Sequence, residues 1–209
     1  RMKNGVWAAV FGNGFDNTEP TSSPVSTTGK AALYIRNIAT GASIKKFLVG
    51  DSDLTSPNGL ASVSPIDLDG DYIVDYIYAG DLKGNLWRFD VTNASTSLWT
   101  ATKIFTACDH SDCTNPSANL QPITTRLQVG RHPEGKEGVI IYFGTGKYFE
   151  VGDDSPTEPT QSFYAVWDRW TGHQAFDRDH MLKQEILAEI TETNTATSED
   201  YEYRVMTDH

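Results

Sequence analysis

Four aspartates fall in one nine-residue stretch of the chain, Asp67-Leu68-Asp69-Gly70-Asp71-Tyr72-Ile73-Val74-Asp75. Carboxylates this close together repel one another unless a cation lies among them, and hard oxygen donors at positions 1, 3, 5 and 9 of a loop suit Ca²⁺. The stretch therefore predicts a calcium-binding loop. Its expected ligands are four side chains and one backbone carbonyl: Asp67, Asp69, Asp71, the carbonyl of Ile73, and Asp75 directly or through water.

The flanking residues distinguish this loop from a helix-loop-helix site. Position 12 is Tyr78 where an EF-hand has a bidentate Glu, and position 6 is Tyr72 where it has Gly. Stretches 76–79 and 85–89 are rich in aromatic and branched residues, and Asp81-Leu82-Lys83-Gly84 between them has the composition of a hairpin turn. We expect the loop to lie at the head of a β-hairpin. The alternative is a solvated acidic turn that holds no metal.

A glycine turn that follows an aromatic strand recurs along the chain. The three copies are Phe11-Gly12-Asn13-Gly14, Tyr78-Ala79-Gly80-Asp81 and Phe143-Gly144-Thr145-Gly146, with Gly12, Gly80 and Gly144 spaced by 68 and 64 residues. Repeated units of several strands predict an all-β fold, a modified β-propeller, of which this chain holds only a part. A β-sandwich whose turns happen to be similar is the alternative.

Strand patterns and polar insertions divide the rest of the chain. The expected strands, beyond the hairpin, are 6–11, 31–41, 44–49, 121–131, 137–144, 163–168 and 201–206. The stretch Asp179–Ile190 fits a short helix or a strand, and the architecture favours a strand. We expect residues 1–209 to form part of one propeller domain, with inserted loops near 17–30, 107–120 and 152–161.

Composition limits the partners. The chain has 209 residues, 11% of them aromatic, and a formal net charge of -11. A chain this acidic is a poor partner for phosphate backbones and anionic membrane surfaces, so no nucleic acid is expected. Membrane insertion is not expected either, because no run approaches the roughly 18 apolar residues that a membrane span requires.

The two cysteines, Cys108 and Cys113, lie in one polar loop with four residues between them. That spacing lets the sulfurs meet, so a local disulfide is the leading interpretation, and it would place the protein in an oxidising compartment. A metal site that also uses His110 lacks an evident fourth ligand. Free thiols are the third alternative.

No pattern predicts catalysis, and we expect a protein that is not an enzyme. The rival class is a quinone-dependent dehydrogenase, because these enzymes also combine propellers with Gly-Asp-x-x-Gly-aromatic turns and calcium. The cysteines are not the adjacent pair associated with that cofactor, and the aspartate loop leaves no vacancy for a quinone. Gly144-Thr145-Gly146-Lys147 lacks the glycine spacing of a phosphate loop and is interpreted as a β-turn.

The residues from Leu60 to Asp90 resemble the calcium-binding signature of the PilY/PilC proteins of bacterial type IV pili. The segments that carry the resemblance include Pro65-Ile66-Asp67-Leu68-Asp69-Gly70-Asp71 and Gly80-Asp81-Leu82-Lys83-Gly84-Asn85-Leu86-Trp87-Arg88-Phe89-Asp90, followed in order by Gln121–Arg131, Tyr142–Tyr148 and Gln161–Asp168, and preceded by Trp7–Gly14. This resemblance covers nearly the whole chain.

The resemblance implies a function in pili. It places the chain in the propeller of a large secreted or outer-membrane-associated protein at the pilus tip, which acts in pilus biogenesis, in the control of extension and retraction, and in surface or host adhesion. The implied partners are the remainder of its own propeller and parent protein, pilin or minor pilins, and a host surface receptor. In this family calcium opposes retraction, and Asp67, Asp69, Asp71, Asp75 and the Ile73 carbonyl match the metal ligands. A purely structural role for calcium is the alternative.

A local switch is the mechanism we expect for the loop. Without a cation the clustered carboxylates favour an open loop, and with Ca²⁺ they converge and order the hairpin from Tyr76 to Asp90. The surface that the hairpin presents would then change.

Overall fold

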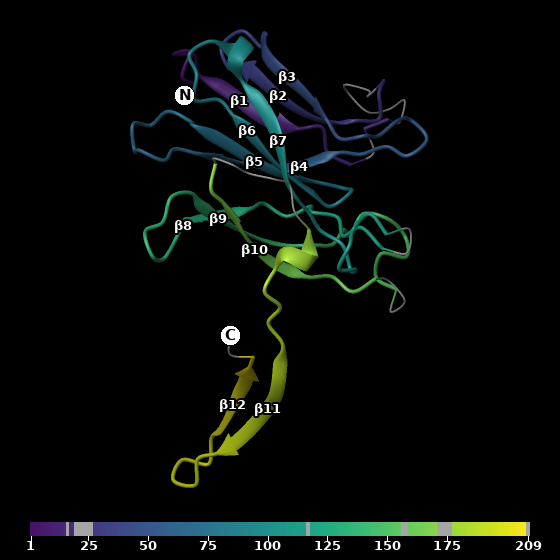
Figure 1. Cartoon of the computed structure of the whole chain (residues 1–209), viewed down its shortest axis with the longest axis vertical. Coiled ribbons are helices and arrows are strands. Elements are labelled where there is room, and N and C mark those ends of the chain that lie inside the picture. The colour runs from purple at the N-terminus through teal and green to yellow at the C-terminus, as the bar shows by residue number, and fades with distance from the viewer. Residues whose placement is uncertain (16, 19–26, 116–117, 156–158, 171–176, 208–209) are drawn as a thin grey trace. The chain divides into compact units, whose positions relative to one another are not determined.

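The computed structural model describes residues 1–15, 17–18, 27–115, 118–155, 159–170 and 177–207 (Figure 1). The chain divides into two compact units, Arg1–Asp179 and His180–His209. The described residues contain strands and two short 3₁₀ turns, η1 (Thr96–Leu98) and η2 (Arg178–His180), and no α-helix. None of the described residues forms a helix long and apolar enough to cross a membrane.

Within the residues that the structure describes, the first unit contains three antiparallel sheets, each built from strands that follow one another along the chain. The first sheet has β1 (Ala8–Gly12), β2 (Ala31–Asn37) and β3 (Ser43–Val49). The second has β4 (Leu60–Ile66), β5 (Tyr76–Asp81), β6 (Asn85–Asp90) and β7 (Thr100–Thr106). The third has β8 (Gln128–Arg131), β9 (Val139–Gly144) and β10 (Phe163–Asp168). Successive meanders of this kind are the blades of a β-propeller, so the predicted fold class is confirmed.

The core lies between neighbouring sheets. Leu33, Ile35 and Phe47 of the first sheet share one buried cluster with Ile77 and Phe89 of the second. The rings of Phe47 and Phe89 have their centroids 5.2 Å apart. Since both faces of the central strands meet apolar neighbours, β2 and β5 are nearly continuous runs of buried residues rather than alternating ones.

A second layer of aromatic residues joins the second sheet to the third. The ring of Phe105 in β7 lies 6.2 Å from the ring of Phe143 in β9 and 5.0 Å from that of Tyr164 in β10. Both ring pairs are in edge-to-face contact, an arrangement that aromatic pairs favour. The sheets thus pack face to face through large side chains.

Two of the recurring glycines allow neighbouring segments to approach closely. A Cβ atom on Gly12 would lie 2.2 Å from the carbonyl oxygen of Leu60, and one on Gly80 would lie 2.2 Å from Cγ2 of Ile123. Neither distance is compatible with a side chain. The repeat in the sequence therefore reflects, at these two positions, the contact between one blade and the next segment.

The expected strands are present, but their bounds differ: β1 begins two residues later than expected, β2 ends at Asn37, and β8 is shortened to Gln128–Arg131. Two strands were not expected. Strand β4 consists of Leu60-Ala61-Ser62-Val63-Ser64-Pro65-Ile66, whose small residues and proline hide its pattern. It lies at the edge of its sheet, where proline is tolerated. Strand β7 forms the other edge. In Asp179–Ile190 only the last residues, from Ile186, are in a strand, and η2 occupies the beginning.

The second unit is a hairpin of β11 (Ile186–Thr193) and β12 (Asp200–Met206), which pair with each other. It forms a compact unit by itself, so the expectation of one propeller domain over residues 1–209 stays a prediction for this part of the chain. Each of the three expected insertions is described in part. Residues 19–26, 116–117 and 156–158 lie outside the described residues.

Candidate metal centre

The aspartate loop connects β4 to β5. Asp75 closes its base, because its backbone N–H donates to the carbonyl of Ile66 (2.8 Å) and its Oδ2 accepts from the N–H of Leu68 (2.9 Å). The side chain of Asp75 is 8% exposed, whereas Asp69 and Asp71 are exposed to solvent. The base of the loop is therefore part of the sheet, and its tip faces outward.

Three carboxylates converge at the tip. One oxygen each from Asp67, Asp69 and Asp71 lies within 4.8 Å of the others. Backbone N–H groups hold each of these carboxylates by at least one oxygen: Gly70 and Tyr72 donate to Asp67, Asp71 donates to Asp69, and Ile73 donates to Asp71. An exposed set of carboxylate oxygens in this arrangement fits a hard divalent cation.

The backbone of the loop is sharply curved. Gly70 has φ +82°, and Tyr72 has φ 63°, in the left-handed region that side chains other than glycine, asparagine and aspartate rarely enter. The side chain of Tyr72 is 86% exposed and therefore gains little from packing. The curvature aims four N–H groups at carboxylate oxygens, and these hydrogen bonds offset its cost.

The same hydrogen bonds keep Asp67 ionised. Desolvation alone would raise the pKa of its carboxyl group, but the N–H groups of Gly70 and Tyr72 outweigh this and lower the pKa below its ordinary value. A lowered pKa means that this contribution to stability is present above the ordinary pKa of aspartate and is lost in more acidic solution. At neutral pH Asp67 therefore carries a charged carboxylate at the tip of the loop.

Two other parts of the first unit contact the loop, the segment before β1 and the end of β8. The N–H of Val74 donates to the carbonyl of Arg1 (2.9 Å), and Met2 forms a parallel bridge with Val74. The ammonium group of Lys3 lies 3.4 Å from Oδ2 of Asp71. From the end of β8, Nη2 of Arg131 donates to the carbonyl of Leu68 (3.2 Å). The loop is thus a junction between three parts of the first unit.

The structure brings together three of the five residues predicted to bind metal. Asp75 lies outside the group of carboxylate oxygens within 4.8 Å of one another and uses one oxygen on Leu68. The ligand roles of all five residues stay predictions. Lys3 and Arg131 were missed, and no local pattern could have revealed them, because they lie more than 50 residues from the groups they contact.

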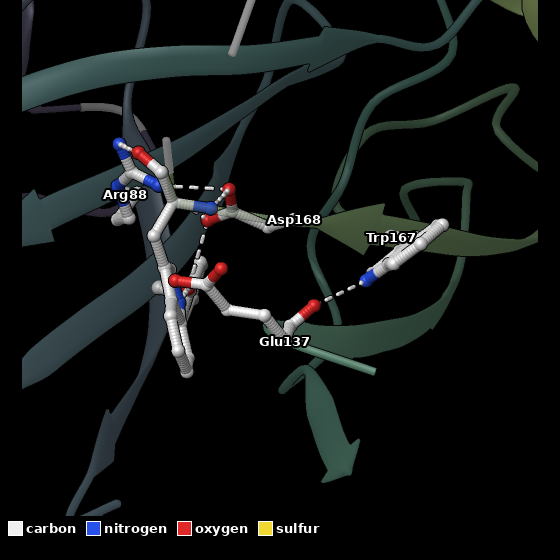
Figure 2. Close-up of polar contacts among 6 residues, drawn as sticks. Arg88, Glu137, Trp167 and Asp168 are labelled. Carbon is white, nitrogen blue, oxygen red and sulfur yellow. Dashed lines mark hydrogen bonds and ion pairs between the residues drawn. The ribbon is translucent and has the colours of Figure 1, made fainter. Parts of the chain in front are cut away.

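A second polar site is buried between β6 and β10 (Figure 2). Nη1 of Arg88 contacts both carboxylate oxygens of Asp168, at 2.7 and 2.9 Å. The hydroxyl of Tyr78 donates to Oδ2 of Asp168 (2.8 Å), and the N–H of Trp170 donates to Oδ1 (3.0 Å). Asp168 is fully buried, so its charge depends on these donors. Beside it, Nε1 of Trp167 donates to the carbonyl of Glu137 (3.0 Å).

This network sets the ionisation of Tyr78. Burial, and then the neighbouring charge of Asp168, raise the pKa of the Tyr78 hydroxyl above that of an ordinary tyrosine. The folded state therefore favours the neutral phenol, whose O–H donates a hydrogen bond to the carboxylate of Asp168. The resulting stabilisation is present below the ordinary pKa of tyrosine, about 10, and declines at higher pH.

Asp81 forms a third polar centre in the turn between β5 and β6. Its Oδ1 accepts from the N–H groups of Lys83 and Asn85, both at 2.9 Å. Its Oδ2 accepts from Nδ2 of Asn85 (3.0 Å) and from Nε1 of Trp87 (2.8 Å). The side chain is fully buried and both oxygens of its carboxylate accept hydrogen bonds, so it holds the turn in place.

Cys108 and Cys113 are joined by a disulfide in the structure, with their Cα atoms 5.6 Å apart. Cys108 is fully buried, and its carbonyl accepts from the Tyr164 hydroxyl (3.2 Å) and from Nη1 of Arg178 (3.1 Å). The bond therefore fixes the start of the inserted loop against β10. It leaves neither sulfur available to a metal.

Comparison with known proteins connects this geometry to one family. The family model described as the PilY1 beta-propeller domain matches residues 1–198. The chain is 36% identical over 184 residues to a "Type IV pilus biogenesis factor PilY1 homolog" of Xylella fastidiosa strain Temecula1, covering 80% of this chain and 11% of that protein. It is 36% identical over 191 residues to the "Type IV pilus biogenesis factor PilY1" of Pseudomonas aeruginosa strain PAO1, covering 84% of this chain and 15% of that protein.

A solved structure shows the same fold. The crystal structure of the C-terminal domain of Pseudomonas aeruginosa PilY1 superposes with a TM-score of 0.77 at 31% sequence identity, covering 100% of this chain and 45% of that chain. The chain thus spans less than half of this solved domain and less than a fifth of the two curated relatives.

Proposed function

Because the chain belongs to the PilY1 β-propeller family, we propose that it is the calcium-binding part of the propeller of a type IV pilus biogenesis factor. Its named relatives are type IV pilus biogenesis factors, and the chain matches 11% and 15% of their lengths. The activity of the whole protein is therefore part of the proposal.

One observation supports a calcium site in the loop between β4 and β5. Three carboxylates, Asp67, Asp69 and Asp71, converge to within 4.8 Å at an exposed tip, and the loop backbone rather than solvent orients them. When bound, Ca²⁺ would supply positive charge that offsets their repulsion. Asp75 would hold the base of the loop through its bond to Leu68.

A calcium-dependent change is not expected at the surface of the hairpin that follows the loop. The hairpin from Tyr76 to Asp90 lies inside a four-stranded sheet, and Ile77, Leu86 and Phe89 are fully buried. The hairpin therefore presents little surface of its own that could change. We place the effect instead at the loop's contacts with Arg1, in the segment before β1, and with Arg131, at the end of β8.

The remaining roles belong to the same proposal. We propose that the protein acts at the pilus tip, outside the cell and associated with the outer membrane, with pilin or minor pilins and a host surface receptor as partners. Calcium would bias the balance of pilus extension and retraction. The disulfide between Cys108 and Cys113 supports an oxidising compartment. We propose no catalytic activity; turnover of an alcohol with an added quinone would contradict this.

Substituting Asp69 with asparagine is expected to weaken calcium binding about 10-fold or more, because the variant keeps the shape of the side chain and removes one ligand charge. Isothermal titration calorimetry on the chain measures the change. Ca²⁺ should also raise the melting temperature of the parent, and raise that of the variant less.

The matched control is Asp51→Asn, which removes the same charge from another exposed loop. It should bind calcium as the parent does. Absence of calcium binding to a folded parent chain would overturn the metal site, and equal binding by the Asp69 variant would remove the aspartate cluster as its location.

In the full-length protein, Asp69→Asn combined with Asp71→Asn is expected to reduce surface pili and twitching while the protein level stays unchanged. The physical reason is that the variant cannot bind the cation that would join the carboxylate ligands of the loop, so the loop is ordered less firmly. Electron microscopy of sheared pili and a motility assay measure the effect, with Asp51→Asn in the same background as control. Normal piliation in a variant shown to bind no calcium would restrict the metal to a stabilising role.

A further inference from the structure

The segment before β1 is fixed beside the metal loop. Met2 is 1% exposed and belongs to the core between the first two sheets. Its neighbours in the chain are held by two further contacts, since the carbonyl of Arg1 accepts from Val74 (2.9 Å) and the N–H of Gly5 donates to the carbonyl of Met2 (2.9 Å). Lys3 therefore leaves the core at a defined place next to the loop.

The ammonium group of Lys3 occupies the one oxygen of Asp71 that the loop leaves free. Oδ1 of Asp71 accepts from the N–H of Ile73 (2.8 Å), and Oδ2 lies 3.4 Å from Nζ of Lys3. About a third of each side chain is exposed, 35% for Lys3 and 37% for Asp71. The contact is thus loose enough to open without disturbing the core.

We propose that Lys3 is an internal counter-ion of the metal loop, and that it competes with calcium for Asp71. This inference rests on the proposed calcium site. In the metal-free loop the ammonium group offsets part of the repulsion among Asp67, Asp69 and Asp71. A divalent cation among the same oxygens repels the ammonium group, so binding of the metal breaks the ion pair and releases the Lys3 side chain.

The other cation at the loop has a different role. Arg131 donates to the carbonyl of Leu68. Within the part of the chain that the structure describes, it forms no ion pair with a carboxylate of the cluster. The Leu68 carbonyl is uncharged, so a bound cation would not compete with Arg131 for a carboxylate. Arg131 should therefore stay in place while Lys3 moves, and calcium would loosen the loop's contact with the first segment and keep its contact with β8.

Calorimetric titration of variants tests the competition. Lys3→Gln should bind calcium about 3- to 10-fold more tightly than the parent, because removing the ammonium group destabilises the free loop and ends its repulsion of the metal. Lys3→Arg keeps the charge and should bind within about twofold of the parent. Lys136→Gln, which breaks the exposed pair with Glu134 and changes the net charge equally, should also stay within about twofold.

Amine footprinting gives a second readout. Acetylation of Lys3, quantified by mass spectrometry, should increase about twofold or more when calcium saturates the chain, and acetylation of Lys136 should not change. Unchanged affinity of Lys3→Gln, or constant labelling of Lys3, in a parent that binds calcium would overturn the counter-ion role and leave the proposed function intact. A parent that binds no calcium would overturn the proposed function and this inference together.

Discussion

Replacing Asp168 with alanine is expected to lower the free energy of unfolding by about 3–5 kcal/mol, because it leaves the Arg88 charge buried and unpaired. Asp168 is fully buried, and the side chain of Arg88 is 10% exposed. The Tyr78 hydroxyl would lose its acceptor as well. Urea unfolding of the first unit, followed by tryptophan fluorescence, measures the loss.

Two comparisons make this test specific. Tyr78→Phe removes one donor and keeps the ion pair, so it should cost only about 1 kcal/mol. Glu134→Ala removes an exposed ion pair with Lys136 and should leave the free energy of unfolding unchanged within error. If Asp168→Ala cost no more than Tyr78→Phe, the pair between β6 and β10 would contribute nothing to the junction of their sheets.

Asp81→Ala is expected to destabilise the fold by about 3–4 kcal/mol, since it removes the acceptor from several buried or partly buried donors at once. Among these donors the indole N–H of Trp87, a residue that is 9% exposed, finds no solvent to replace the carboxylate. The turn between β5 and β6 also loses the bonds from Lys83 and Asn85 that shape it. Thermal and urea unfolding measure the loss.

Asp90→Ala is the matched control at the other end of β6. Its carboxylate accepts from the N–H and the hydroxyl of Thr92 in an exposed turn, so its loss should cost less than about 1 kcal/mol. Similar losses for Asp81→Ala and Asp90→Ala would mean that burial of the Asp81 carboxylate is unimportant. Calcium affinity should be unaffected by either substitution if the metal site is the loop from Asp67 to Asp75.

The two fully buried aspartates, Asp81 and Asp168, have a different role from the carboxylates of the proposed metal loop. Asp81 and Asp168 are saturated with donors inside the fold, and they join strand to turn and sheet to sheet. The loop carboxylates converge at an exposed tip and are oriented by backbone N–H groups, which is the arrangement that the proposed calcium site requires. Asp168 lies at a junction between two sheets, which a propeller must hold together, whereas Asp81 fixes a turn within one sheet.

The sequence by itself determined much of what depends on residues close together in the chain. The spacing of Asp67, Asp69 and Asp71 predicted their convergence, because a nine-residue loop cannot carry them far apart. The aromatic runs predicted β2, β5, β6, β9 and β10, and the spacing of Cys108 and Cys113 predicted their disulfide. Two small-residue or edge strands, β4 and β7, escaped this reasoning, since they carry a weak apolar pattern.

Only the tertiary structure decided which distant residues meet. Lys3 reaches Asp71 across 68 positions, Arg131 reaches Leu68 across 63, and Arg88 reaches Asp168 across 80. The local sequence of Asp168 resembles that of any aspartate after an aromatic strand, and its burial follows from the sheet that packs against it. Periodicity records how one segment bonds with its neighbours in the chain, whereas the partner of a charge depends on how whole blades are stacked. The loop could thus be found from the sequence, but its internal counter-ion could not.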